Sequence, residues 1–221
     1  MKKGRIWMIA GSVFLLGAII YCMYNFYREY SAGERVEAVY EELSAIIEET
    51  IAEKEAEAAE DTESEGTLVN DTQTLYEQYP NMEMPTVEID GNRYIGILEI
   101  ESIGLELPVM SDWSMEKLET SPCRYSGSVY SHDIVICGHN YRRHFSPIKW
   151  LEIGTTATFT DVDGNQFYYE LSYTDVIAPE GIDLMKTADG TWDLTLFTCT
   201  TGGGSRMTLR FVLTGSKAVG T

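Results

Sequence analysis

The most continuous feature of the chain is an uncharged apolar stretch, residues 6–27, with the sequence IWMIAGSVFLLGAIIYCMYNFY. As an α-helix these 22 residues would extend about 33 Å, which is enough to cross the hydrocarbon core of a bilayer. Aromatic residues cluster at its C-terminal end, and Lys2, Lys3 and Arg5 precede it. The pattern predicts an uncleaved membrane anchor, with residues 1–5 as a cytoplasmic tail and everything after Arg28 outside. Small residues at 31–33 leave a cleaved signal peptide as the alternative, which the length of the apolar stretch disfavours.

A second pattern, with helical periodicity, follows in an acidic segment. Apolar residues recur at spacings of four, three and four, at Val36, Tyr40, Leu43 and Ile47. Residues 34–65 carry 13 acidic side chains against two basic ones. We therefore expect residues 28–92 to form an acidic amphipathic helix that grades into a solvated linker and acts as a spacer. A short coiled-coil dimer is the alternative, although the stripe covers barely two heptads.

From residue 93 onward the pattern changes to short β-type runs separated by Gly, Pro, Asp and Ser. The runs are residues 94–100, 105–110, 128–130, 134–137, 155–160, 166–178, 193–199 and 206–213. Helical patterns are brief, at residues 113–118, 145–151 and 182–185. Residues 93–221 are thus predicted to be an all-β domain of about eight strands, either a closed antiparallel barrel or a sandwich. Asp163-Gly164 favours a hairpin, and it sits too early in its loop for a calcium-binding EF-hand.

Composition narrows the function classes. The net charge of −19 would repel phosphate backbones, so nucleic-acid binding is excluded as a general activity. No two of the four cysteines are spaced as C-x-x-C, which argues against a structural zinc site. No metal, cofactor or required disulfide is expected.

Three residue types at strand ends suggest a thiol site. Cys199 ends an alternating run and precedes the small-residue loop Thr200–Gly204, and His139 follows the apolar run 134–137. Arg206 and Arg210 share one face of the last run. Together they could supply a nucleophile, a proton shuttle and a fixed cation. Taken singly, a strand cysteine is more often a small core residue and a lone histidine a surface residue. The other two histidines, His132 and His144, are expected to be solvated.

The pairing of the last two runs follows from their turn. If the chain turns at Gly202-Gly203, antiparallel pairing puts Cys199 opposite Arg206, and Thr195 opposite Arg210. Directly opposed residues are close neighbours, so the pairing favours Arg206 as the cation of the site. Arg210 remains the alternative if the turn is wider.

The motifs also resemble a known family. LTLFTC (194–199) followed by Arg206 resembles the L-T-L-x-T-C…R signature of sortases, and IVICGHN (134–140) resembles the sortase strand that leads to the catalytic G-H pair. Residues 107–109 (LPV) and 159–171 (FTDVDGNQFYYEL) are similar to further family segments. The resemblance covers about residues 93–214. It implies a closed eight-stranded sortase-type β-barrel and cysteine transpeptidation.

By this resemblance, Cys199 attacks a sorting signal of the LPXTG type, His139 protonates the departing amine, and Arg206 supports the oxyanion. Thr198, Asn140 and Arg210 are substrate-binding candidates. The implied partners are cell-wall sorting-signal peptides and an acceptor amine of a peptidoglycan cross-bridge or a pilin lysine. The implied location is the plasma membrane, with one span, a cytoplasmic N-terminus and an extracellular catalytic domain.

Two alternatives to a transpeptidase stay open, a thiol peptidase that only hydrolyses such peptides and a non-catalytic membrane-tethered β-domain. The sortase class is not assigned, although the short segment 179–192 leans away from class B. Asp112-Trp113 only faintly resembles the lid motif of pilin sortases.

Overall fold

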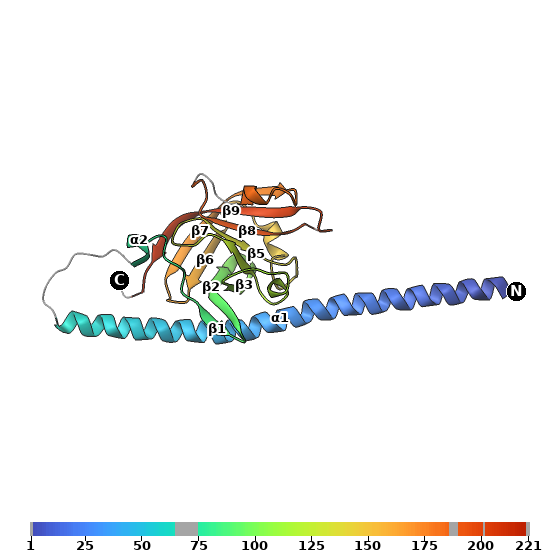
Figure 1. Cartoon of the computed structure of the whole chain (residues 1–221), viewed down its shortest axis with the longest axis horizontal. Helices are drawn as coiled ribbons and strands as arrows, with labels where there is room; N and C mark the ends of the chain where they lie inside the picture. Colours follow the sequence, from blue (N-terminus) through green and yellow to red (C-terminus); the bar gives the residue numbers. More distant parts are fainter. Residues whose placement is uncertain (1, 65–74, 186–189, 201, 220–221) are drawn as a thin grey trace.

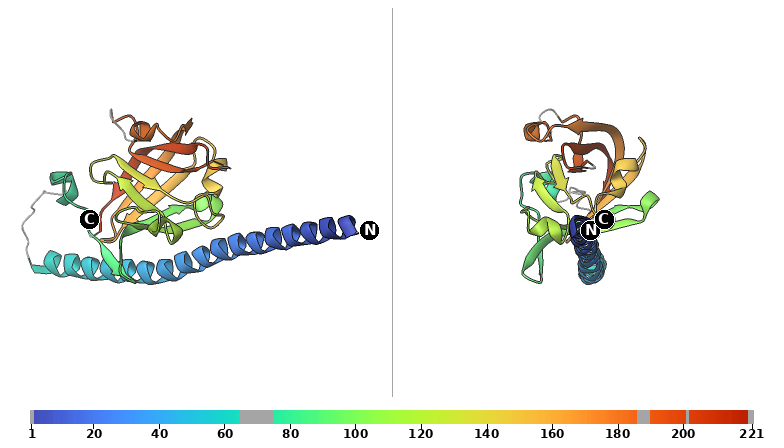
Figure 2. Two further views of the ribbon diagram at one scale, coloured as in Figure 1. Left: turned by 45° about the vertical axis from the view of Figure 1, so that its right-hand side comes forward. Right: turned by 90° about the vertical axis from the view of Figure 1, so that its right-hand side faces the viewer.

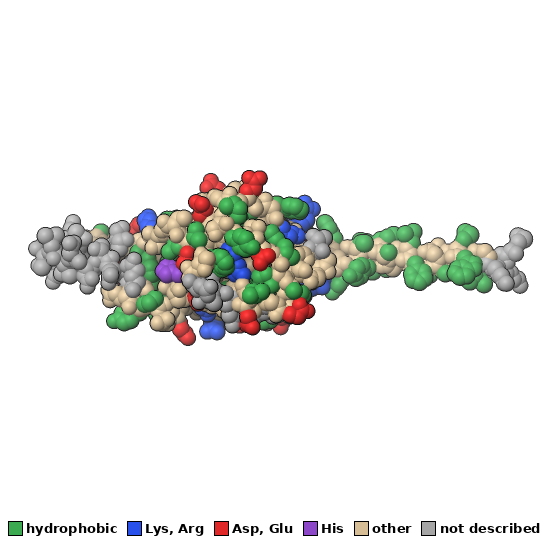
Figure 3. Space-filling view, turned by 90° about the horizontal axis from the view of Figure 1, so that it is seen from above, with side chains coloured by type: hydrophobic (Ala, Val, Ile, Leu, Met, Phe, Trp, Pro, Cys, Tyr) green, Lys and Arg blue, Asp and Glu red, His purple; other side chains and the backbone are tan. Residues whose placement is uncertain are grey.

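The apolar stretch and the acidic segment form one continuous helix, α1 (Lys2–Ser64), which runs past the rest of the molecule (Figure 1). The structure, a computed structural model, describes residues 2–64, 75–185, 190–200 and 202–219. Residues 34–64 contain neither Gly nor Pro, so nothing in their sequence interrupts the helix. Of the helices described, α1 alone is long and apolar enough to cross a membrane. Its projecting N-terminal part is covered with hydrophobic side chains (Figure 3).

The remaining elements are mostly strands. After the short helix α2 (Leu75–Gln78) come β1 (Val87–Ile89), β2 (Asn92–Ile100), β3 (Leu105–Met110), β4 (Cys123–Ser126), β5 (Ile134–Cys137), β6 (Thr156–Asp161), β7 (Gln166–Ile177), β8 (Leu194–Cys199) and β9 (Arg206–Lys217). Four 3₁₀-helical turns, Glu101–Ile103, Lys117–Glu119, Pro147–Trp150 and Ile182–Met185, lie between them. The last three overlap the short helices that the sequence predicts.

Eight of the strands close into a ring. The order is β2-β3-β4-β5-β8-β9-β7-β6, and β6 pairs back to β2, while β1 extends β2 as a hairpin. In the view along α1 the strands curve around a common interior (Figure 2, right). Buried aromatic rings fill the ring interior, among them Tyr169, Phe159, Phe167 and Phe211. The eight-stranded closure expected from the sequence is thus observed.

Several details differ from the expected strand pattern. Residues 128–130 lie in a loop, and the fourth strand is β4 at Cys123–Ser126 instead. The pairs β3–β4 and β5–β8 are parallel, so the sheet is not wholly antiparallel. Parallel pairing needs a long crossover, which residues 138–193 provide between β5 and β8. The sheet also begins at β1, before the boundary expected at residue 93.

The apolar stripe of the acidic segment packs against the chain's own sheet. Val39, Leu43 and Ile47 are at most 6% exposed and join a cluster with Ile89 of β1 and Met110 of β3. The acidic segment is therefore helical, as expected, but its stripe is buried within this chain. The sheet covers the stripe, so no coiled-coil partner is needed to bury it, and this part of the helix is not a free spacer.

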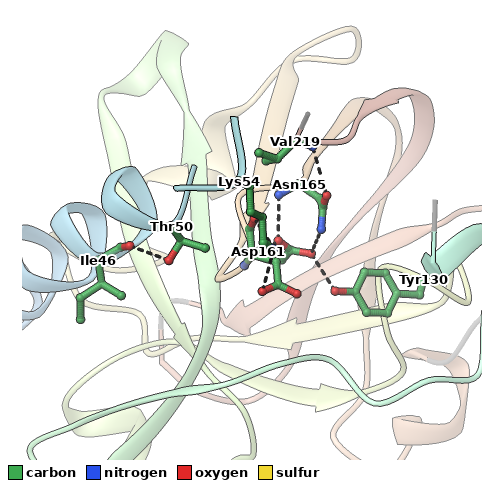
Figure 4. Close-up of polar contacts among 8 residues, drawn as sticks. Ile46, Thr50, Lys54, Tyr130, Asp161, Asn165 and Val219 are labelled. Atoms are coloured by element: carbon green, nitrogen blue, oxygen red, sulfur yellow. Dashed lines mark hydrogen bonds and ion pairs between the residues drawn. The ribbon is translucent and has the colours of Figure 1, made fainter. Parts of the chain in front are cut away.

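The far end of this contact is fixed at the turn between β6 and β7 (Figure 4). Lys54 Nζ donates to the backbone oxygen of Asp163 and forms an ion pair with its Oδ1, each at 3.1 Å. Asp161 shapes the turn, because its carboxylate accepts bonds from the backbone N–H groups of Asp163 and Asn165, the Asn165 amide and the Tyr130 hydroxyl at 2.7–3.0 Å. The chain's own donors occupy this carboxylate, in keeping with the hairpin interpretation.

Candidate active site

The predicted pairing of β8 with β9 is confirmed. Cys199 lies opposite Arg206 and Thr195 lies opposite Arg210 in the antiparallel register. The connection is wider than a two-residue turn, because the Thr200 N–H donates to Ser205 O at 3.0 Å and closes a longer loop. Its centre is nevertheless the same, so the register is unchanged. Cys199 therefore stands at the end of β8 beside Arg206, and its side chain is half-buried.

His139 is brought to the same place by the parallel pair β5–β8. Beyond the last paired residue of β5, the Gly138 N–H donates to Phe197 O at 3.1 Å. The Thr198 hydroxyl donates to Gly138 O at 2.9 Å. These two bonds tie the residue before His139 to the two residues before Cys199. The general acid candidate is thus fixed to the strand that carries the thiol.

Gly138 has a steric reason to be glycine. A Cβ atom added there would lie 2.6 Å from the ring of Phe145, which is fully buried. The Phe145 N–H also donates to His139 O at 3.1 Å, which closes the loop that follows. Glycine is therefore required before His139 because the Gly138 backbone packs directly against the Phe145 ring.

Cys199, His139 and Arg206 line one cavity of about 230 Å³. Its other walls are mainly apolar and come from the β3–β4 and β7–β8 connections, from β4 and from the β8 face that carries the thiol. They include Trp113, Met115, Leu118, Tyr125, Pro179, Met185 and Phe197. The rings of Trp113, Tyr125 and Phe197 contact in series, with centroids 5.4 and 5.5 Å apart. An extended peptide with apolar side chains would fit such walls.

The two arginines have different surroundings. Arg206 is half-buried, and its Nη1 donates to Gly203 O and Ser205 O, both at 3.2 Å, so its guanidinium stays at the cavity. Arg210 is 3% exposed and is not among the residues that line the cavity. It donates to Thr195 Oγ1 at 2.7 Å, to Met185 O at 2.8 Å and to Leu184 O. Its place is between β8, β9 and the 182–185 turn.

Burial and nearby charges set the ionisation of the site. Burial lowers the pKa of His139, the Glu119 carboxylate opposes this shift and Arg28 adds to it. Burial raises the pKa of Cys123 to about 12 and raises that of Cys137 further still. All four cysteines are free, and of the three in the β-domain Cys199 is the one that is not fully buried.

The other candidates are dispersed. Thr198 lines the cavity, but its hydroxyl is engaged with Gly138. Asn140 Oδ1 accepts a bond from Lys149 Nζ at 2.5 Å, and Asn140 is not a lining residue. His132 is exposed, as expected, whereas the expectation of a solvated His144 is wrong because this side chain is fully buried. The loop folds back at Tyr141, whose oxygen accepts the His144 N–H, and turns the imidazole inward.

Most residues of the cavity wall were not predicted from the sequence. Phe197 could have been found, since it alternates with Cys199 on one strand face. Trp113 belongs to the Asp112-Trp113 pair, whose faint resemblance to a lid motif was the one sequence signal in the β3–β4 connection. Met115 and Leu118 of the same connection carry no signal of their position in space. Among the described residues, no cluster of three or more His, Cys, Asp or Glu side chains is arranged to hold a metal ion.

Comparisons with known proteins place this fold in a family. The family model of the sortase domain matches residues 98–218. Three similar structures are a sortase D5 transpeptidase of Clostridium perfringens (24% identity, TM-score 0.51, 58% of this chain and 83% of that one), sortase C1 of Streptococcus agalactiae (20%, 0.52, 76% and 90%) and sortase E1 of Streptomyces coelicolor with a tripeptide in its active site (17%, 0.51, 56% and 90%). At these identities the likeness shows the fold. No curated protein matches the chain.

Proposed function

Since the chain belongs to the sortase family, we propose that it is a membrane-anchored cysteine transpeptidase acting on cell-wall sorting signals of the LPXTG type. The observation that carries the proposal is that Cys199, His139 and Arg206 line one apolar-walled cavity, with Cys199 directly opposite Arg206. The family supplies the reaction type, and this arrangement supplies the residues for it.

The reaction needs a thiolate, an acid and an oxyanion stabiliser. Cys199 Sγ attacks the carbonyl carbon of the scissile residue, and Arg206 stabilises the oxyanion that forms. His139 donates its proton to the departing amine, leaving a thioester on Cys199. An incoming amine, deprotonated by His139, attacks the thioester carbonyl. The C–S bond then breaks and releases the Cys199 thiolate, with His139 again protonated.

The substrate class is proposed from the cavity walls. Leu and Pro of a sorting signal are apolar, and the rings of Trp113, Tyr125 and Phe197 offer a matching surface beside the thiol. A similar structure, sortase C of Clostridium perfringens at 21% identity and TM-score 0.50, was solved with the C-terminal cell-wall sorting motif. The proposed acceptors are the amine of a peptidoglycan cross-bridge or of a pilin lysine.

The proposed location is the plasma membrane, with α1 spanning it once. The basic residues before the apolar stretch support a cytoplasmic location of residues 1–5. The rest of α1, packed along the sheet, would then hold the β-domain on the outer side of the membrane.

The test is incubation of the full chain in detergent micelles with a library of LPXTG-type peptides, with and without triglycine, read by mass spectrometry. A transpeptidase yields the triglycine adduct, and Cys199→Ala yields none. Cleavage without any adduct would make the protein a hydrolase. Absence of cleavage and of thioester across the library would favour a non-catalytic β-domain.

A further inference from the structure

The part of α1 that immediately follows the apolar stretch docks on the loop that carries His139. Residues 28–37 contact Arg142 and Arg143 of this loop and Glu119 at the end of the 117–119 turn. Glu119 and Arg28 are the two charges that act on the pKa of His139, so this contact lies within electrostatic reach of the imidazole.

Glu119 is held from two sides by arginines of α1. The Arg28 guanidinium forms an ion pair with the Glu119 carboxylate. Arg35 Nη2 donates to the Glu119 backbone oxygen at 3.2 Å. One end of the 117–119 turn is thus attached to the helix through both its side chain and its backbone.

The histidine loop is held in the same way. Glu29 Oε1 accepts the Arg142 N–H at 2.8 Å, and Arg143 Nη1 lies 3.2 and 3.4 Å from carboxylate oxygens of Glu34 and Glu37. Gly33 allows the close approach, because a Cβ atom there would lie 2.1 Å from Cδ of Arg143. The loop and the helix therefore meet along a surface fitted to both.

The loop transmits this contact to His139 through packed rings. The Tyr141 ring lies 4.8 Å from the His139 ring and 5.4 Å from the fully buried His144 ring. A shift of the loop at residues 142 and 143 would move Tyr141 and the imidazole in contact with its ring.

These contacts contribute little to stability, because Arg28, Glu119 and Arg143 are 38–49% exposed and such ion pairs are weak. Five polar contacts nevertheless converge on one ten-residue stretch of α1 beside the imidazole. We propose that Arg28, Glu29 and Arg35 are positioning residues, which hold Glu119 and the 139–144 loop so that His139 faces Cys199. This inference rests on the proposed pairing of His139 with Cys199.

The test measures the rate at which iodoacetamide alkylates Cys199 in the full chain in nanodiscs, which needs no sorting signal. A neighbouring imidazolium promotes the thiolate, so a displaced His139 slows alkylation. The triple variant Arg28→Ala/Glu29→Ala/Arg35→Ala is expected to lose at least about threefold in rate at pH 7. The conservative triple variant Arg28→Lys/Glu29→Gln/Arg35→Lys keeps the two positive charges and the acceptor oxygen that form these contacts. It is expected to restore most of the alkylation rate.

The matched control lies at the other end of the same helix contact. Ile51→Ala/Lys54→Ala loosens α1 at the 161–165 turn (Figure 4) and is expected to alkylate Cys199 at the wild-type rate. A wild-type rate in the alanine triple variant, or an equal loss in the Ile51/Lys54 variant, would overturn the inference. His139→Ala tests the underlying function separately: if it alkylates as fast as wild type, the thiol–imidazole pair itself fails, and the inference with it.

Discussion

The thiol of Cys199 differs from those of Cys123 and Cys137 in its access to solvent. Burial raises the pKa of Cys123 and Cys137, so a smaller fraction of each is thiolate at neutral pH. We expect iodoacetamide to label Cys199 at least about tenfold faster than either, as measured by peptide mass spectrometry. Cys137→Ala should keep transpeptidase activity. A folded but inactive Cys137→Ala variant would mean that Cys137, and not Cys199, is the nucleophile.

The two arginines separate chemistry from stability. Arg206→Ala should lose most transpeptidation, and Arg206→Lys should recover a part, because a point charge does not replace a guanidinium. Arg210→Ala should instead lower the free energy of unfolding by about 3 kcal/mol, since three oxygens lose a charged donor. Denaturant titration and peptide turnover of both variants check this. Swapped results would assign the catalytic cation to Arg210.

His144 makes stability depend on pH. Burial, aided by the charge of His139, lowers its pKa to about 4, against about 6.5 in the unfolded chain. The unfolded state therefore binds more protons between these values, so stability is full above about pH 6.5 and falls as the pH drops toward 4. The loss amounts to about 3 kcal/mol, and melting temperatures at pH 7.5 and 4.5 measure it.

His144→Gln should flatten this dependence, whereas His132→Gln, at an exposed position, should leave it unchanged. An unchanged slope in His144→Gln would place the sensitivity elsewhere.

At the scale of the elements, the junction of β5 with β8 determines where the imidazole stands. Gly138→Ala would place its Cβ 2.6 Å from the Phe145 ring, so either the ring or the loop must move. We expect turnover to fall by at least about tenfold, because a misplaced acid is ineffective. Gly138→Ala/Phe145→Leu, with a smaller side chain opposite, should regain part of it; Gly138→Ala with full activity would show that the packing is dispensable.

The register of β8 and β9 was predictable because two local signals agreed, the alternation that ends at Cys199 and the glycines at 202 and 203. The parallel pairs β3–β4 and β5–β8 were not, since no local pattern encodes the crossover connection of either pair, and the partners β5 and β8 are also far apart in the chain. His144 shows the same limit: charged neighbours in sequence suggested solvent, but a turn at Tyr141 reverses the side chain. The stripe of α1 predicted an apolar face without specifying what covers it.

At the scale of the whole molecule, α1 is part of the folded domain. Leu43 is fully buried against the sheet, so Leu43→Ala should lower the free energy of unfolding by about 3 kcal/mol. Glu42→Ala, at a neighbouring exposed position, is the control. Thermal unfolding in detergent measures both, and equal melting temperatures for Leu43→Ala and wild type would mean that the helix is a detachable spacer.

The continuity of α1 has a consequence for how the enzyme would meet other molecules. The docked region begins at Arg28, the first residue after the apolar stretch, so no slack separates the proposed span from the catalytic domain. A domain on a long flexible linker could reach far from the membrane, whereas this domain would be confined to a thin layer next to the lipid. Its encounters with other membrane-held molecules would then be two-dimensional, governed by lateral diffusion and surface density instead of bulk concentration.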